Sequence, residues 1–176
     1  RGLVVRLPNV GCRVVDLSAE DLRAVIEMRR QLEPAVVGWA AQRIRDEDHG
    51  PLLEQWQRMD EAAQRDDMIG FFHEDLAFHR MIWRIAGNRF AERALEMAAG
   101  PMFASGIVRG VRNGTLLLKK ESQKHRKMLQ AILKGDTERA PQVLTEIAKD
   151  FEVHLVENAA AGPAGGGPKR KRSEAQ

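Results

Sequence analysis

Asp75-Leu-Ala-Phe-His79 is the stretch of sequence that decides the fold. On an α-helix, residues four apart lie on one face about a turn from each other, so this stretch stacks a carboxylate and an imidazole. At about 100° per residue, the same face also carries apolar residues, namely Met68, Phe72, Ile82 and Ala86. A buried polar group costs free energy unless it has a partner. What closes over Asp75 and His79 therefore decides the function.

The composition is that of an ordinary globular protein. The chain has 176 residues, of which 43% are hydrophobic and 30% are charged. A single cysteine, Cys12, excludes an internal disulfide and favours a reducing, cytoplasmic location. No run of about 18 apolar residues is present, so no membrane-spanning segment is expected. The net charge is only +3, and part of the excess comes from Lys169-Arg-Lys-Arg172, so the charge gives little evidence for a nucleic-acid surface on the body.

Helical periodicity, capping residues and breakers predict six helices. Ser18 is the expected N-cap of the first, and Gly87 and Gly135 end the third and the fifth. The expected ranges are about 18–45, 46–65, 67–86, 89–109, 112–134 and 137–158. Short connections between such helices predict an all-α fold, an antiparallel bundle.

The two ends of the chain have a different character. Residues 3–7 and 12–15 are short β-branched runs on either side of a turn at Pro8-Asn-Val-Gly11, which predicts a small β-hairpin before the bundle. From residue 159 onward the chain is rich in Ala, Gly and Pro and then basic, which predicts a disordered tail over residues 159–176.

Polar residues on the apolar faces of several helices are the candidates for chemistry. His125 shares one face of its helix with Leu118, Ser122, Leu129 and Ile132. Together with Asp75 and His79 it offers a carboxylate and two imidazoles from facing helices, the ligand set that Zn, Ni, Mn or a similar divalent metal uses in a bundle core. The alternative is that each histidine is a neutral core residue with one ordinary hydrogen-bond partner.

Arg29 lies on the apolar seam of the first helix, between Val25 and Leu32. A guanidinium stays charged at working pH, so its burial requires an anion. That anion is either an internal carboxylate, such as Glu33 or Asp75, or a small carboxylate ligand held as a bidentate pair. An open metal position beside Arg29 would make a pocket for an organic acid.

Several short motifs, in order and with matching spacing, resemble one family. Glu27-Met-Arg-Arg-Gln-Leu-Glu-Pro34 is similar to E-x-R-x-x-L-E-P, Asp75-Leu-Ala-Phe-His79 to D-x-x-F-H, and Ala86-Gly-Asn88 to the A-G-N that follows. His125-Arg126, Ala131-Ile132 and Gly135-Asp136 are similar to H-R-x-x-x-x-A-I-x-x-G-D. This set resembles the FCD ligand-binding domain of the FadR subfamily of GntR transcription regulators.

The resemblance implies an antiparallel bundle of six or seven helices over residues 18–158 that binds a small organic acid and a metal and forms a homodimer. It also implies DNA binding through a winged helix-turn-helix domain on the N-terminal side. Residues 1–17 resemble the wing hairpin of that domain, so the chain is expected to be a truncated regulator, a wing remnant followed by the sensor. Sequence-specific reading of DNA requires a helix in the major groove, which would precede Arg1.

The resemblance assigns the metal ligands to Asp75, His79 and His125 and the effector carboxylate to Arg29. The family's fourth ligand is a histidine, and the matching position here is Ile147. Isoleucine binds no metal. Three outcomes stay open: a three-ligand site completed by water or effector, rescue by Asp150 or His154, or loss of the metal.

Three functions compete at this point. The leading one is the effector-sensing and dimerisation domain of a transcription regulator, without enzymatic activity. The second is a metal-dependent, hydrolase-like enzyme in which an open metal position activates water. The third is a purely structural helical dimer. No Ser/His/Asp or Cys/His nucleophile pattern, phosphate-binding glycine loop or pair of Glu-x-x-His motifs is present in the sequence.

Overall fold

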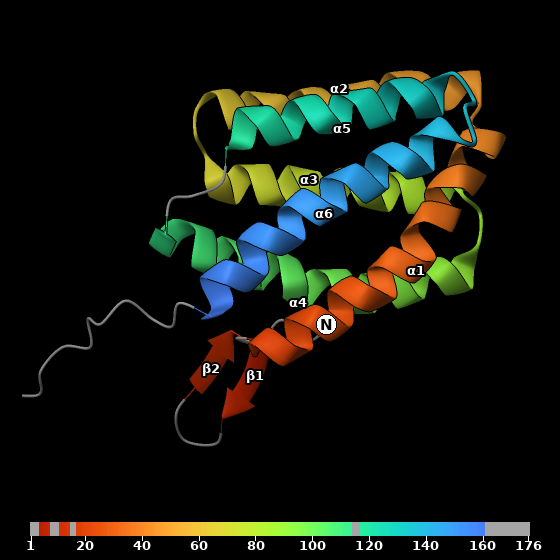
Figure 1. Cartoon of the computed structure of the whole chain (residues 1–176). Helices are drawn as coiled ribbons and strands as arrows, with labels where there is room; N and C mark the ends of the chain where they lie inside the picture. The colour runs from red at the N-terminus through yellow and green to blue at the C-terminus, as the bar shows by residue number, and fades with distance from the viewer. Residues whose placement is uncertain (1–3, 8–10, 15–16, 114–116, 161–176) are drawn as a thin grey trace, which may run out of the picture.

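The computed structural model of the chain describes residues 4–7, 11–14, 17–113 and 117–160. Six helices make up the body: α1 Ala19–Arg43, α2 Asp46–Gln64, α3 Met68–Ile85, α4 Arg89–Asn113, α5 Leu118–Leu133 and α6 Arg139–Ala160 (Figure 1). The helical bundle expected from the sequence is confirmed. The main differences are that α4 continues past residue 109, that α5 begins later than residue 112, and that α6 extends to Ala160.

Two short strands precede the helices, β1 Val4–Leu7 and β2 Gly11–Val14. They pair in antiparallel fashion, with Val4 opposite Val14 and Leu7 opposite Gly11. Residues 8–10, where the sequence predicts the turn, lie outside the described residues. The predicted basic tail also lies outside them from residue 161 onward.

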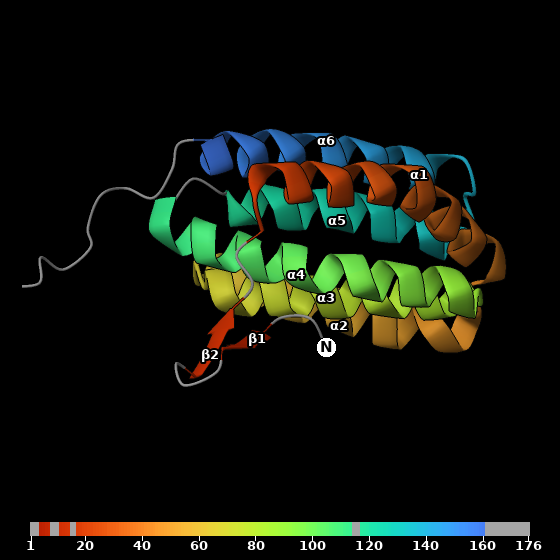
Figure 2. The same ribbon diagram turned by 90° about the horizontal axis from the view of Figure 1, so that it is seen from below.

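Each helix packs against two neighbours in the closed order α1, α4, α3, α2, α5, α6 and back to α1. Figure 2 shows this ring from below as two layers, with α1, α5 and α6 above α2, α3 and α4. Contacts also cross the ring, from α1 to α3 and α5 and from α4 to α6. Side chains that point inward from several helices therefore meet in the same interior space.

The start of α1 and the start of α3 are set by capping. The Ser18 hydroxyl accepts a hydrogen bond from the Asp21 amide at 3.0 Å, and the Asp21 carboxylate accepts one from the Ser18 amide at 3.1 Å, a complete capping box. Asp67 caps α3 by accepting from the Gly70 amide at 2.9 Å. This cap fixes where α3 begins, and with it the rotation of the face that carries the polar stretch.

The end of α3 depends on glycine. Gly87 has φ of +67°, in the left-handed region where a Cβ would be strained, and Gly135 ends α5 in the same way with φ of +68°. Directly after Gly87, the Asn88 side chain accepts from the Phe90 and Ala91 amides and so begins α4. The Arg43 guanidinium at the end of α1 donates to the Ala86 carbonyl, which joins the ends of α1 and α3.

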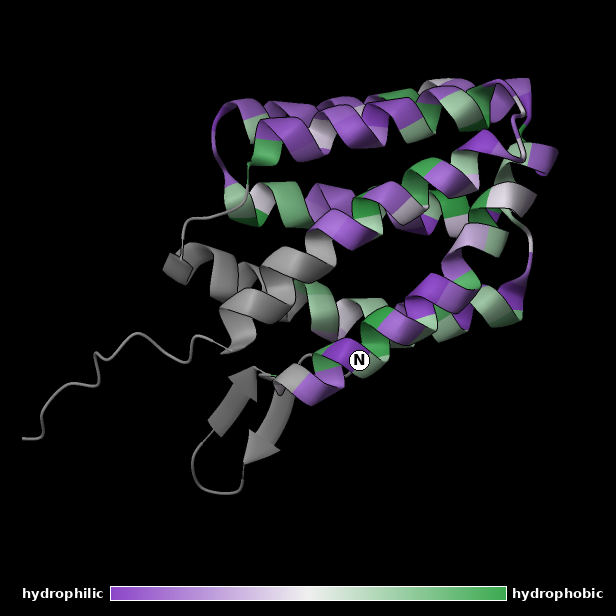
Figure 3. Cartoon of the chain, in the orientation of Figure 1, coloured by the Kyte–Doolittle hydropathy of each residue, from purple (hydrophilic) through white to green (hydrophobic). Residues whose placement is uncertain are grey.

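The interior is apolar apart from a small group of polar residues. Its fully buried large side chains include Trp83, Phe71, Phe78, Leu52 and Met128. Figure 3 shows long hydrophilic stretches along α2 and α5, which agrees with the many Lys, Glu and Gln residues of these helices. The buried polar residues are Glu33, Gln55, Asp75, His79, Glu121, Ser122 and His125. None of the helices in the described part of the chain is long and apolar enough to cross a bilayer.

Candidate functional site

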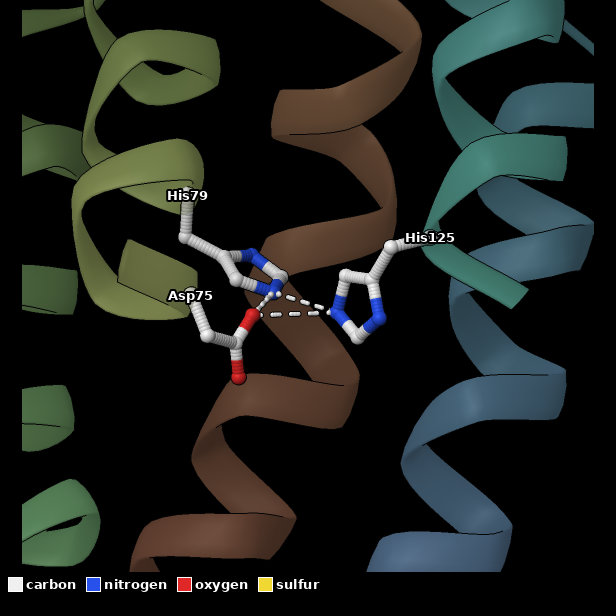
Figure 4. A group of neighbouring side chains, drawn as sticks. All are labelled: Asp75, His79 and His125. Atoms are coloured by element: carbon white, nitrogen blue, oxygen red, sulfur yellow. Dashed lines mark hydrogen bonds and ion pairs between the residues drawn. The ribbon is translucent and has the colours of Figure 1, made fainter. Parts of the chain in front are cut away.

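Asp75 and His79 of α3 and His125 of α5 meet in the interior, as the sequence predicts. Figure 4 shows the two rings and the carboxylate pointing toward one another. The Asp75 Oδ1 atom lies 3.1 Å from His125 Nε2 and 3.5 Å from His79 Nε2, and the two Nε2 atoms lie 3.4 Å apart. All three residues are at most 6% exposed. Three potential metal ligands from two helices therefore converge on one buried point.

Hydrogen bonds between α2 and α5 orient His125 toward α3. The Trp56 indole donates to the Ser122 carbonyl at 3.1 Å, and the Ser122 hydroxyl donates to Asp60 at 2.5 Å. His125 itself uses Nδ1 to donate to the Glu121 carbonyl one turn earlier, at 2.8 Å. This bond fixes the orientation of the ring and directs Nε2 toward Asp75.

Glu33 of α1 orients the other imidazole. Its Oε1 atom lies 2.9 Å from His79 Nδ1 and accepts a hydrogen bond from the Trp83 indole at 3.1 Å. The His79 contact is an ion-pair contact rather than a well-aligned hydrogen bond, since Nδ1 has no partner of good geometry. A carboxylate at this distance favours the proton on Nδ1, so the Nε2 lone pair of His79 also faces Asp75. A carboxylate that accepts from the other ring nitrogen is the usual support of a histidine that binds a metal.

Arg29 lies beside this cluster and pairs with Glu33, which is one of the anions that the sequence offers as its partner. Its Nε and Nη2 atoms lie 2.9 and 2.7 Å from Glu33 Oε2, and the side chains are 13% and 4% exposed. Nη1 contacts the Met102 sulfur at 3.2 Å, and the guanidinium lies 5.5 Å from the centre of the Phe103 ring. A thioether is a weak acceptor, so Nη1 is the donor of Arg29 that an anionic ligand would satisfy best.

Ionisation of the cluster follows from these contacts. Burial raises the pKa of Glu33, but the charges of Arg29 and His79 outweigh it and lower that pKa to about 2. Burial also raises the pKa of Asp75, and His125 and His79 outweigh it, so the carboxyl titrates below its usual range. Burial lowers the pKa of His125, but the Asp75 charge outweighs it and the net shift is upward. Both carboxylates are therefore charged at neutral pH.

The pH dependence of stability should show the contribution of Glu33. The pKa of Glu33 is about 2 in the folded protein against 4.5 for the free group, so its contribution is fully present above about pH 4.5 and is lost as the pH falls toward about 2. Urea unfolding at a series of pH values measures this contribution. Across this range the free energy of unfolding of the wild type should fall by on the order of 3 kcal/mol more than that of Glu33→Gln. Parallel pH profiles of the two proteins would contradict this ionisation of Glu33.

A cavity of about 170 Å³ lies next to the cluster, and Arg29, Asp75, His79 and His125 all line it. Its other walls come from α1, α3, α4 and α6 and are mainly apolar. The exposed residues Arg30 and Gln31 also line it, so the cavity reaches the surface along α1. All four residues that the sequence singles out for binding thus surround one space.

The position of the expected fourth ligand carries an apolar side chain, and this side chain lines the cavity. Ile147 of α6 is 6% exposed and lines the cavity. Asp150, one of the two suggested replacements, pairs with Lys124 at 2.6 Å and is half exposed. The other, His154, lies in α6, but its side chain is outside the described residues. Among the described residues, the converging group therefore has three members.

Two further carboxylates, Glu33 and Glu121, line the cavity, and the sequence does not identify either as a residue of the binding site. Glu33 was only one of several candidate partners for Arg29, and its contacts with Trp83 and His79 join residues far apart in the chain. Glu121 is 5% exposed, lines the cavity and pairs with Lys124 at 2.6 Å. Glu121 lies one helical turn before His125, and this spacing is the feature of the sequence that could have identified it as a neighbour of the site.

The FCD domain model matches residues 24–150 of the chain. The chain belongs to the FCD domain family. The match spans all four candidate site residues and helices α2, α3, α4 and α5 completely. A search of curated protein sequences gives no significant match.

Solved structures of related folds support the architecture. The FCD chain superposes on McbR/YncC of E. coli with a TM-score of 0.76 and 17% identity, covering 88% of this chain and 77% of that one. A structure described as a GntR transcriptional regulator of Rhodococcus sp. RHA1 matches with a TM-score of 0.69 and 21% identity. This match covers 89% of this chain and 73% of that one. The metal-free FCD domain of TM0439 matches with a TM-score of 0.64 and 20% identity. This match covers 82% of this chain and 98% of that one.

Proposed function

We propose that this FCD domain is the effector-sensing and dimerisation part of a GntR/FadR-type transcription regulator. A small organic acid binds in the cavity, contacts Arg29 and a divalent metal, and changes how the regulator binds DNA. DNA is contacted through an N-terminal winged helix-turn-helix domain, to which residues 1–17 contribute the wing. The effector acts because it binds two conformations of the regulator with different affinity.

One observation carries the proposal: three potential metal-ligand atoms converge beside a largely buried arginine at a cavity. With Nδ1 of each histidine directed to Glu33 or to the Glu121 carbonyl, both Nε2 atoms face Asp75 Oδ1, an atom without a hydrogen bond of good geometry. Three electron-rich atoms within 3.5 Å repel one another unless a cation or proton lies between them. Without a metal, a proton on His125 Nε2 pairs it with Asp75, and a divalent ion would take the place of that proton on binding.

The residues present fit a divalent metal. A tetrahedral ion with ligands at about 2.1 Å holds neighbouring ligand atoms about 3.4 Å apart, close to the 3.1, 3.4 and 3.5 Å seen here. Imidazole and carboxylate suit Zn, Ni or Mn, and support from Glu33 and from the Glu121 carbonyl is in place. When bound, the metal supplies a fixed positive charge that attracts a carboxylate. Asp75, His79 and His125 would hold it, with Ile147 contributing no ligand.

The site is less well suited to the alternative, a metal-dependent hydrolase. Such an enzyme needs a base near the open metal position. Among the described residues that line the cavity, the two remaining carboxylates both have cationic partners, Glu33 with Arg29 and Glu121 with Lys124. Neither is placed as a base that is available to a substrate.

Thermal unfolding with a panel of organic and fatty acids tests the proposal. The purified chain is measured after loading with Zn²⁺, Ni²⁺ or Mn²⁺ and again after chelation. An acid at about one hundred times its Kd should add about 2.7 kcal/mol, which corresponds to roughly 5–10 °C in Tm for a domain of this size. The mass by sedimentation should be that of a dimer.

Two results would count against sensing. If no acid raises Tm, with or without metal, the effector-binding function is wrong. If the chain instead hydrolyses an ester, amide or phosphate, and Asp75→Ala abolishes this turnover while the protein stays folded, the enzyme is the better description.

A further inference from the structure

The cavity has one charged wall and several apolar walls. Arg29 and the three converging ligands form the charged wall. The apolar walls come from four helices: Ile26 of α1, Phe71 and Phe72 of α3, Phe103 of α4, and Leu144 and Ile147 of α6. Such a division suits a ligand with one charged end and one apolar end.

We propose that the effector is a monocarboxylate with a compact apolar body, of which benzoate is the model, rather than a dicarboxylate or a hydroxy acid. This inference rests on the proposed effector-binding function and specifies the class of acid.

The balance of buried charge favours one carboxylate. Glu33 is neutralised by Arg29, with Oε2 2.7 Å from Nη2, and Glu121 is paired at 2.6 Å with Lys124, which also pairs with the half-exposed and therefore solvated Asp150. Asp75 offsets one of the two charges of a divalent metal, so one positive charge remains, and a single carboxylate balances it. A second carboxylate in the interior would lack a cation, and burial of an unpaired charge is strongly unfavourable. Arg30 also lines the cavity, but it is exposed, so water screens its charge.

The size of the cavity favours a small body. An apolar cavity of about 150 Å³ in another protein holds a benzene molecule. The cavity here, at about 170 Å³, is of the size that takes one ring with a carboxyl group and little more. The acyl chain of a long fatty acid would extend beyond it.

The nature of the walls favours an aromatic or similarly compact apolar group. Phe71 and Phe72 form an edge-to-face pair with ring centres 6.0 Å apart, and Phe72 and Phe103 form another at 6.1 Å. Rings arranged in this way present edges and faces to a further ring. Ile147 lies where the family resemblance places a histidine, so this position offers a hydroxylated ligand no polar partner. The Thr145 hydroxyl, which lines the cavity from the same helix, already donates to the Pro141 carbonyl at 2.9 Å.

Calorimetric titration of the zinc-loaded full chain with matched acids tests the inference. Benzoate is compared with phthalate, which adds a second carboxylate to the same ring, and with succinate and lactate. Benzoate should bind at least about tenfold more tightly than each of the others, because burial of an unpaired charge or hydroxyl costs more than about 1.4 kcal/mol. Equal or tighter binding of phthalate, succinate or lactate overturns the inference and leaves the proposed function standing. If no acid binds at all, the proposed function itself fails.

Variants at position 147 test the apolar wall. Ile147→Val and Ile147→Thr have nearly the same shape and differ by a methyl and a hydroxyl. Ile147→Thr should bind benzoate roughly three- to tenfold more weakly than Ile147→Val, whereas acetate, which has no extended body, should not distinguish them. Equal benzoate affinity in two variants that unfold at similar temperatures would overturn the assignment of this wall. If Ile147→Thr does not fold, Ile147→Val alone should still bind benzoate about fourfold more weakly than the wild type, because it removes one buried methylene.

Discussion

Arg29→Met is expected to lower the free energy of unfolding by about 3 kcal/mol and to abolish binding of organic acids. The Glu33 carboxylate is 4% exposed, and Arg29 is its principal cation, so the variant leaves a buried charge without its partner. The same change removes the guanidinium that lines the cavity. Urea unfolding at pH 7 measures the first effect, and calorimetric titration measures the second.

The double variant Arg29→Met, Glu33→Gln separates these two effects. Removing both charges takes away the penalty of the unpaired carboxylate, so most of the stability should return, whereas acid binding should stay lost. If Arg29→Met is as stable as the wild type and binds acids normally, the arginine has neither role. The purely structural helical dimer would instead be favoured if Arg29→Met were as stable as the wild type and neither protein bound an acid.

Loss of a metal ligand should have the largest effect on metal affinity. His79→Gln and Asp75→Asn should each weaken zinc binding by more than about a hundredfold, since loss of a supporting group alone typically costs about 10–100-fold. Competition with a chromophoric chelator measures the affinity, and elemental analysis of the purified protein measures the metal content.

His73→Gln is the matched control for His79→Gln. His73 lies on the same helix, but its side chain is 78% exposed and pairs with Glu74. The control should bind zinc as the wild type does. Unchanged zinc affinity in Asp75→Asn and His79→Gln would show that the converging atoms hold no metal, and the effector would then depend on Arg29 alone.

The sequence predicted the helical face at the site correctly. Asp75, His79, Phe72 and Ile82 are buried on one side of α3, whereas His73 and Arg84 are exposed, as the 3.6-residue period requires. His125 and Ser122 were likewise predicted to share the inner face of α5, and both are buried. Local periodicity is sufficient for such predictions, because the buried side of an amphipathic helix follows from the order of its residues.

Helix ends were predicted less accurately where glycine and proline also occur inside the helix. Gly87 and Gly135 mark the ends of α3 and α5 because each adopts a left-handed conformation that other residues rarely take. The fourth helix was expected to end at about residue 109, but α4 continues through Pro101 and Gly106 to Asn113, the residue before Gly114. Local propensity is a weak guide there, because a single glycine or proline lowers the stability of a helix without always ending it.

By itself, the sequence determined that the chain forms an amphipathic helical bundle and which polar groups of α1, α3 and α5 point inward. These properties follow from residue order within single helices. Only the tertiary structure decided that Glu33 joins Arg29 to His79 and Trp83, and that Asp150 pairs with Lys124 rather than with the ligand group. Such contacts depend on the relative rotation and height of helices distant in the chain, which packing of the whole core sets.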